Sequence, residues 1–206
     1  MTMFNKNKKK IEVLNFAADL AIFDGWSDKT LFAAATKADI TSKEAKELFP
    51  RAGIDLARFY HQHQDQIFFK EFLQIDISNF SHFEKVEIAM KMRFRAMAKN
   101  KEGLRKGMAI FAMPMYQIEG INLVWSTCDL IWFNIKDKSA GLSWYSKRIT
   151  LVSVYLTTLL FFLGDHSSDS RETDSFISRR LEDVKKLGML KVNFADFIKK
   201  LNIITS

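Results

Sequence analysis

The stretch SWYSKRITLVSVYLTTLLFFLGD, Ser143–Asp165, decides the fold, because its residues 149–164 carry no charge. Three readings are open: a membrane span, a buried helix, or the wall of an apolar pocket. The sixteen uncharged residues fall short of the roughly 20 that cross a bilayer. Four hydroxyl side chains dilute them further: Thr150, Ser153, Thr157 and Thr158. We therefore predict a soluble helix that is apolar on every side and covered on every side.

The rest of the composition favours helices. The chain has 206 residues, with nineteen Phe and only two Pro. This length favours one domain, with a second small one possible. The hydrophobic spacing is helical along nearly the whole chain, which predicts an all-α fold of about ten helices. The single Cys128 excludes an internal disulfide and fits a reducing compartment. The basic start, MTMFNKNKKK, does not read as a secretory signal.

The net charge of +7 is concentrated at the two ends of the chain. The four lysines within residues 1–10 give +4, and five lysines less Asp196 within residues 185–206 give another +4. Residues 11–184 therefore carry −1. Basic tails on a near-neutral body suggest attraction to a charged surface more than a body that reads DNA.

Residues 1–52 are expected to form a helix-turn-helix-like bundle. The segment VLNFAADLAIFDGWSDKTLFAAATKADITSKEAKELFPRAGIDL resembles the DNA-binding end of TetR-type regulators, with Gly25–Trp26 and Leu48–Pro50 at matching places. A recognition helix usually carries surplus positive charge. The stretch 41–49 carries two lysines against two glutamates. We therefore expect no specific nucleic acid, and keep a TetR-type ligand-responsive transcriptional regulator as the alternative function.

The second half resembles the ubiquinone-biosynthesis accessory family, called coenzyme Q protein nine in eukaryotes, whose members are lipid-binding relatives of TetR proteins. The resemblance rests on WSTCDLIW, WYSKR, VYLTTLLFFLGD and FISRRLEDV, in that order, within residues 125–184. The chain differs at residues 141–143, Gly-Leu-Ser, where the family usually carries an acidic residue. The resemblance implies a TetR-like fold with residues 53–190 as a helical lipid-binding and dimerisation domain.

The same resemblance implies a non-enzymatic function. The protein would bind an isoprenoid quinone intermediate or a phospholipid and present the quinone intermediate to the ring hydroxylase of the pathway. It would form a homodimer through its C-terminal helices. It would be cytoplasmic and peripheral on the inner membrane of a bacterium.

Candidate lipid-binding residues lie where flexible and aromatic apolar side chains gather. Methionine fills irregular space and tolerates varied ligands, and lipid pockets are mostly apolar. The alternative is that these residues form an ordinary core. Hydroxyls at 150, 153 and 157 would let a second helix approach closely or face a polar group of the ligand. The candidates are Met108, Phe111, Met115, Trp125, Ile131, Trp132, Val152, Tyr155, Leu156 and Leu159.

A partner-binding patch is expected at Asp137, Trp144 and Tyr145. The two aromatics lie between an acidic residue and the Lys147–Arg148 pair, a composition typical of interface hot spots. The resemblance implies a partner patch at this place. The alternative is a buried helix start.

Residues 191–206 are expected to form a C-terminal amphipathic helix. Its apolar residues recur at helical spacing and basic residues flank them, which suits an anionic membrane surface. The alternative is a helix that packs on a partner or on its own fold. The candidate membrane residues are Phe194, Phe197, Ile198, Lys199, Lys200 and Leu201.

We predict no enzyme activity, no metal and no cofactor. His61 and His63 are two positions apart, so on a helix they point in nearly opposite directions and make a poor metal pair. The segment 165–169 has one His among carboxylates but no second ligand cluster at metal spacing. No glycine-rich phosphate loop occurs in the sequence.

Overall fold

The computed structural model describes the backbone of residues 3–204 and the side chains of residues 5–187. Within that backbone there are nine α-helices, one short 3-10 helix and no strand, which confirms the all-α fold. In chain order these are α1 (Met3–Asp24), α2 (Asp28–Lys37), α3 (Ser42–Leu48), α4 (Gly53–Phe72), α5 (His82–Ala98), α6 (Lys101–Phe111), α7 (Gln117–Asn134), α8 (Gly141–Gly164), η1 (Ser168–Ser170) and α9 (Arg171–Ile204).

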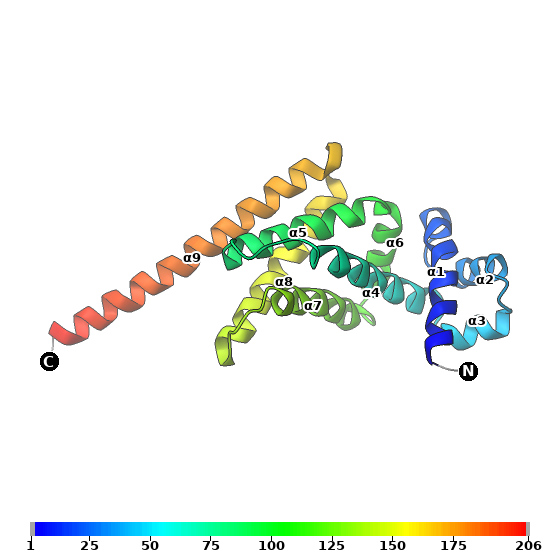
Figure 1. Ribbon diagram of the computed structural model, residues 1–206, viewed down its shortest axis with the longest axis horizontal. Helices are drawn as coiled ribbons and strands as arrows, with labels where there is room; N and C mark the ends of the chain where they lie inside the picture. The colour runs from blue at the N-terminus through cyan, green and yellow to red at the C-terminus, as the bar shows by residue number, and fades with distance from the viewer. Residues whose placement is uncertain (1–2, 205–206) are drawn as a thin grey trace.

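Helices α1–α3 form a small bundle at one end of the molecule (Figure 1). The side chain of Ser27 caps α2 and that of Thr41 caps α3, each by accepting a bond from a backbone N–H. Trp26 is buried, and its Nε1 donates to the carbonyl oxygen of Gly103 at 2.8 Å. The turn that follows Gly25 therefore attaches the bundle to α6.

Helix α4 joins two hydrophobic cores. Its first turns, at Leu56 and Ala57, belong to the core of the bundle. Its later turns, at Phe68 and Phe72, belong to a larger core that α5, α7, α8 and α9 complete. Figure 1 shows α4 running from the bundle into that larger group of helices. The domain boundary expected after residue 52 stays a prediction, since the first turns of α4 pack with the bundle.

Helix α8 is long and apolar enough, by length and composition, to cross a membrane, but it packs as a helix of this domain. Its buried residues are Arg148, Leu151, Val154, Tyr155, Thr158, Leu159 and Phe162. The opposite face is open: Ile149 is 56% exposed and Leu160 is 68% exposed. The expectation that this helix is covered on every side is therefore wrong, because the neighbouring helices of the single chain pack on one face only.

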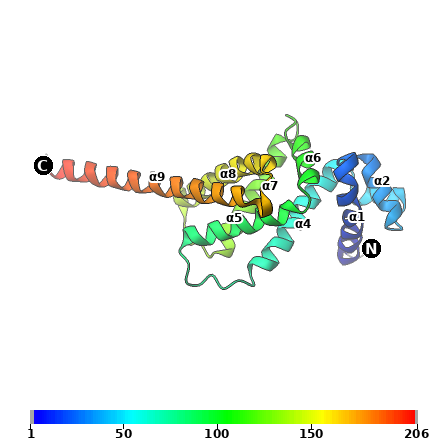
Figure 2. The same cartoon turned by 90° about the horizontal axis from the view of Figure 1, so that it is seen from above.

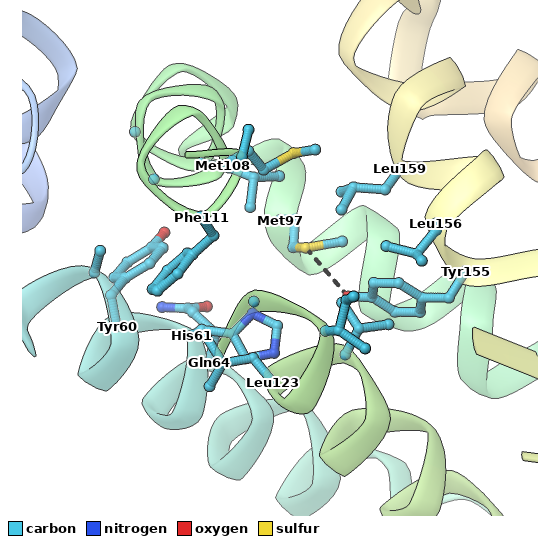
Figure 3. A pocket seen from close by; sticks show the side chains of 18 of the residues that line it. Tyr60, His61, Gln64, Met97, Met108, Phe111, Leu123, Tyr155, Leu156 and Leu159 are labelled. Atoms are coloured by element: carbon cyan, nitrogen blue, oxygen red, sulfur yellow. Dashed lines mark hydrogen bonds between the residues drawn. The ribbon is translucent and has the colours of Figure 1, made fainter. Parts of the chain in front are cut away.

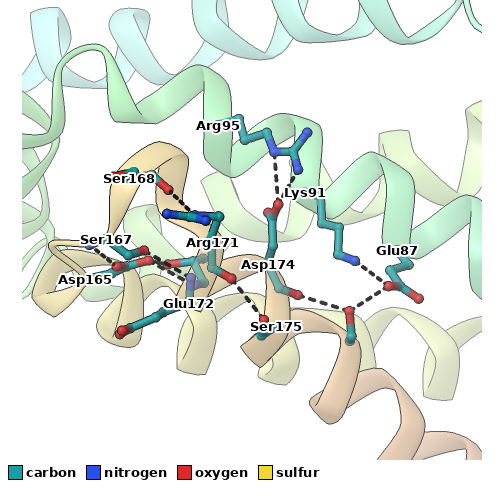
Figure 4. Close-up of polar contacts among 12 residues, drawn as sticks. Glu87, Lys91, Arg95, Asp165, Ser167, Ser168, Arg171, Glu172, Asp174 and Ser175 are labelled. Atoms are coloured by element: carbon teal, nitrogen blue, oxygen red, sulfur yellow. Dashed lines mark hydrogen bonds and ion pairs between the residues drawn. The ribbon is translucent and has the colours of Figure 1, made fainter.

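Helix α9 begins at a tight corner after α8. The carboxylate of Asp165 accepts bonds from the backbone N–H groups of Ser167 (2.7 Å) and Thr173 (2.9 Å). Burial acts to raise the pKa of Asp165, but these bonds outweigh it and hold that pKa well below its usual range. An Arg95–Asp174 ion pair then ties α9 to α5 (Figure 4).

The end of the chain forms one helix where the sequence predicted two. Helix α9 runs without a break to Ile204, and its C-terminal part extends beyond the other helices (Figure 2). One glycine within a helix costs only about 1 kcal/mol relative to alanine, and the segment contains no proline. The backbone therefore continues where a boundary near residue 191 was expected.

Candidate functional site

A cavity of about 250 Å³ lies among helices α4–α8, and Trp26 from the turn between α1 and α2 also lines it. Apolar side chains make most of its wall. In Figure 3, Met108 and Phe111 of α6 lie opposite Leu156 and Leu159 of α8. The helical spacing of each pair, three residues apart, points both side chains into the same space. The cavity therefore has the apolar lining expected for a hydrocarbon ligand.

One wall of the cavity is polar. Tyr60, His61 and Gln64 line it from α4, and their spacing places them on one face of that helix (Figure 3). Arg93 lines it from α5, where its side chain is only 1% exposed. An apolar cavity with a few convergent polar groups is the usual form of a small-molecule site.

A network of hydrogen bonds lies behind this polar wall. Arg93 Nε donates to Asp65 Oδ1 at 2.8 Å, and Thr127 Oγ1 lies 2.8 Å from Asp65 Oδ2. His61 Nε2 lies 2.9 Å from the same Thr127 hydroxyl. In the tautomer with hydrogen on Nε2, His61 donates to Thr127, which donates to Asp65. The carboxylate thus receives a donor on each oxygen and offsets the buried guanidinium.

The charges of this network follow from burial. Burial lowers the pKa of His61 to about 4, so its imidazole is neutral at pH 7. Burial also acts to lower the pKa of Arg93, but Tyr155 and Asp65 beside it raise that pKa above its ordinary value. Arg93 is therefore a cation. Together with the Asp65 carboxylate it makes the polar wall a neutral ion pair.

The structure brings half of the candidate lipid-binding residues to this cavity: Met108, Phe111, Tyr155, Leu156 and Leu159. It places the other half elsewhere. Met115 is 75% exposed, and Trp125 packs against Trp144. Of the remaining three, Ile131 belongs to the larger core, and Trp132 and Val152 are partly buried and pack against it. Ile131 therefore has the position of an ordinary core residue.

Sequence reasoning missed five polar residues that line the cavity: Tyr60, His61, Gln64, Arg93 and Gln117. A signal was available for Arg93. It lies in the apolar stripe of α5, three positions after Met90 and four before Met97. A charged residue inside such a stripe is rarely fully buried without a partner. The partner, Asp65, is 28 positions away, and only the fold brings the two together.

The candidate partner patch lies at the start of α8. Trp144 is half-buried, with its ring 6.1 Å from Trp125 and 4.7 Å from Tyr145 between centroids. The guanidinium of Arg148 lies 3.8 Å over the Trp144 ring. Tyr145 is 57% exposed. Arg148 itself is buried, so the accessible part of this patch is aromatic: Tyr145 and the half-buried Trp144.

Asp137, the third residue of the predicted patch, is less accessible than Trp144 and Tyr145. Its carboxylate is buried, and Lys147 Nζ donates to it at 2.6 Å. Burial acts to raise the pKa of Asp137, but the bonds from Lys147 and Ser139 lower it overall. Asp137 therefore ties the loop before α8 to Lys147 on that helix, whereas the Tyr145 side chain is exposed to solvent.

The candidate membrane residues Phe194, Phe197, Ile198, Lys199, Lys200 and Leu201 lie outside the residues whose side chains are described. Their backbone belongs to α9. The amphipathic character of this segment therefore stays a prediction from the sequence.

Helix α3 offers little charge to a nucleic acid. Lys46 pairs with Asp28 at 3.1 Å, and Glu44 pairs with Lys9 at 2.7 Å. Lys43 and Glu47 are the remaining charged residues of α3, and both are exposed. The balance of charges within α3 is zero, so this helix lacks the surplus that phosphate contacts need.

Among the residues with described side chains, no group of three or more His, Cys, Asp or Glu residues is placed to hold a metal ion. Cys128 is buried on α7, and burial raises the pKa of its thiol, which keeps it protonated.

The fold is TetR-like. A solved TetR transcriptional regulator from Nitrosomonas europaea superposes with a TM-score of 0.69, covering 84% of this chain and 95% of that one. The two share 20% sequence identity, so the likeness concerns the fold.

The sequence resemblance to the COQ9 family is confirmed over one segment. The model of that family matches residues 118–188, which hold α7, α8 and the first half of α9. The "probable ubiquinone biosynthesis protein coq9, mitochondrial" of Dictyostelium discoideum is 31% identical over 110 residues, 53% of this chain and 36% of that protein. The rat "ubiquinone biosynthesis protein COQ9, mitochondrial" is 23% identical over 185 residues, 85% of this chain and 58% of that protein. The matches thus cover about a third to three-fifths of these relatives.

Proposed function

We propose that this protein is a non-enzymatic lipid-binding accessory protein of ubiquinone biosynthesis. It binds an isoprenoid quinone intermediate and presents it to the hydroxylase that modifies the ring. The observation that carries the proposal is the apolar cavity with one polar wall. Helices α7 and α8, which form part of that cavity, lie within the segment that matches the COQ9 family. The names of the matched relatives supply the pathway.

The size of the cavity sets how much of the ligand it holds. A cavity of about 150 Å³ holds one benzene ring. The 250 Å³ present here suits a substituted ring and a few further carbons. A long isoprenoid tail must therefore leave through the mouth, where the exposed residues Ala112, Gln117 and Ile121 belong to the lining.

Native mass spectrometry of the purified protein, followed by lipid extraction, tests the carrier function. We expect a bound species with the mass of an isoprenoid quinone intermediate. Leu159→Trp fills the cavity and should reduce the bound fraction severalfold. Leu73→Trp is the matched control, because Leu73 is 61% exposed and does not line the cavity. Purification without any bound lipid contradicts the proposal, and phospholipid alone removes its quinone part.

The hydroxylase is proposed to bind the surface around Trp144 and Tyr145. Large aromatics with a charged rim are the usual anchors of an interface. Tyr145→Lys should weaken hydroxylase binding about thirtyfold or more, since hot-spot truncations cost roughly 2 kcal/mol. Leu142→Lys, one turn earlier and also exposed, is the control. Equal affinities of the two variants, measured by surface plasmon resonance, would move the partner surface elsewhere.

A homodimer is proposed through the open face of α8. Ile149 and Leu160 are exposed there, and the small residues Ser153 and Thr157 lie between them. Small side chains let the same face of a second copy approach closely. A two-fold dimer uses one self-complementary patch twice. Burying the exposed aliphatic side chains of this face would remove the solvent contact that the single chain leaves open.

Location at the cytoplasmic face of a bacterial inner membrane is proposed from the basic tail. The matched relatives are named mitochondrial proteins. Lysines near an anionic bilayer contribute about 1 kcal/mol each. Removal of residues 192–206 should strongly reduce co-sedimentation with anionic vesicles while leaving the helical circular dichroism signal of the body. Undiminished vesicle binding would assign the tail to a protein contact.

A further inference from the structure

We propose that the cavity takes its ligand ring-first and that a neutral acceptor oxygen on the ring, a carbonyl or a phenol, binds the guanidinium of Arg93. The inference rests on the proposed lipid-carrier function and adds the chemistry of the head group and its direction. The same site would reject anionic head groups such as carboxylates and phosphates.

The guanidinium of Arg93 has unused donors. Its Nε donates to Asp65, whereas its Nη1 is buried and has no hydrogen-bond partner among the residues with described side chains. Buried donors in native proteins are nearly always paired, because an unpaired one keeps the full cost of desolvation. Arg93 also lines the cavity. An oxygen delivered from the cavity is therefore the missing acceptor.

The charge of the site selects a neutral oxygen. The Asp65 carboxylate already offsets the Arg93 cation. His61 beside them is neutral at pH 7, since burial lowers its pKa. An anionic head group would add a buried negative charge without a second cation in the cavity lining. A carbonyl or phenol oxygen accepts the same hydrogen bond without that penalty.

The shape of the lining sets the direction. Arg93 is buried and the His61 side chain is only 14% exposed, whereas the exposed lining residues are Ala112, Gln117 and Ile121 at the α6–α7 turn and Leu156 on α8. The ring therefore enters first and the tail leads outward. Leu156 at the rim and Trp144 in the partner patch are twelve residues apart on α8, about 18 Å along the helix. The ring must accordingly leave the cavity before a partner at the patch can act on it.

Three probes with one tail and different head groups test the inference on the full chain. They are 2-decyl-1,4-benzoquinone, decylbenzene and 4-decylbenzoate, titrated below their aggregation limits by isothermal calorimetry. We expect the quinone to bind about ten- to a hundredfold tighter than decylbenzene, as hydrogen bonds to charged groups allow. The benzoate should bind most weakly.

Each other outcome overturns the inference. Equal binding of quinone and decylbenzene means that Arg93 engages no ligand oxygen, and it leaves the carrier function standing. Tightest binding of the benzoate refutes the neutral head group. Binding of none of the three overturns both this inference and the proposed function.

A matched pair of double variants assigns the preference to Arg93. Asp65→Leu with Arg93→Met removes the ion pair of the cavity without leaving a lone charge, and should reduce the quinone preference to within about threefold. Asp174→Leu with Arg95→Met removes an ion pair between α9 and α5 that lies outside the cavity lining, and this variant should keep the quinone preference. A preference retained in the first variant refutes the role of Arg93. If that variant does not fold, the three-probe comparison on the unmodified chain decides.

Discussion

Arg93→Met alone is expected to destabilise the protein strongly, because it leaves the Asp65 carboxylate buried without its cation. The Asp65 side chain is 7% exposed and would keep the Thr127 hydroxyl as its close donor. Removal of one partner of a buried ion pair costs about 3–5 kcal/mol. In a chain of this size 1 kcal/mol shifts the melting temperature by about 2–4 °C. The expected fall is therefore about 6–20 °C.

The double variant Asp65→Leu with Arg93→Met is the decisive comparison. Replacement of a buried pair by apolar residues of similar volume is often neutral or stabilising by 1–4 kcal/mol. Thr127 loses one acceptor but keeps the carbonyl oxygen of Leu123 at 3.2 Å. Both variants are melted in parallel by circular dichroism at 222 nm. If the single variant melts within 2 °C of the double variant, the carboxylate is not desolvated and the argument from burial fails.

Three further predictions concern backbone packing, pH and assembly. Gly53→Ala should cost about 1–3 kcal/mol or more, because its Cβ would lie 2.2 Å from a backbone oxygen of the α1–α2 turn. Gly164→Ala has no atom within 4 Å and should stabilise by about 0.4–1 kcal/mol in the same urea titration. The free energy of unfolding should be constant with respect to His61 above pH 6.5. It should fall by up to about 3 kcal/mol as the pH drops towards 4, because His61 takes up a proton in the unfolded chain but stays neutral in the folded one. His61→Gln should flatten that slope, and an unchanged slope would assign it to other groups. Leu160→Glu should reduce the molar mass from that of a dimer to that of a monomer, measured by light scattering after size exclusion. If the variant remains a dimer, the open face of α8 is not the interface.

The sequence was sufficient for the broad plan of the molecule. Hydrophobic residues at helical spacing favour helices through interactions within a few residues, and with only two prolines in the chain little interrupts them. Local signals of this kind need no knowledge of the fold. The order of motifs in residues 125–184 also carried the resemblance that the comparisons confirmed over residues 118–188. The near-neutral charge of α3 could be predicted because all the charged residues counted lie within that one helix.

Only the tertiary structure decided which apolar residues form the cavity and which form the core. Tyr155 and Ile131 both lie in apolar helical segments and both were candidates for lipid binding, yet only Tyr155 lines the cavity. The polar wall depends on Asp65 and Arg93, whose partnership spans two helices and 28 positions. The open face of α8 could not be predicted either, because the sequence of a helix that is apolar on all sides does not show which of its faces neighbouring helices cover. Helix formation is local, whereas a cavity and an exposed face are set by how separate helices pack.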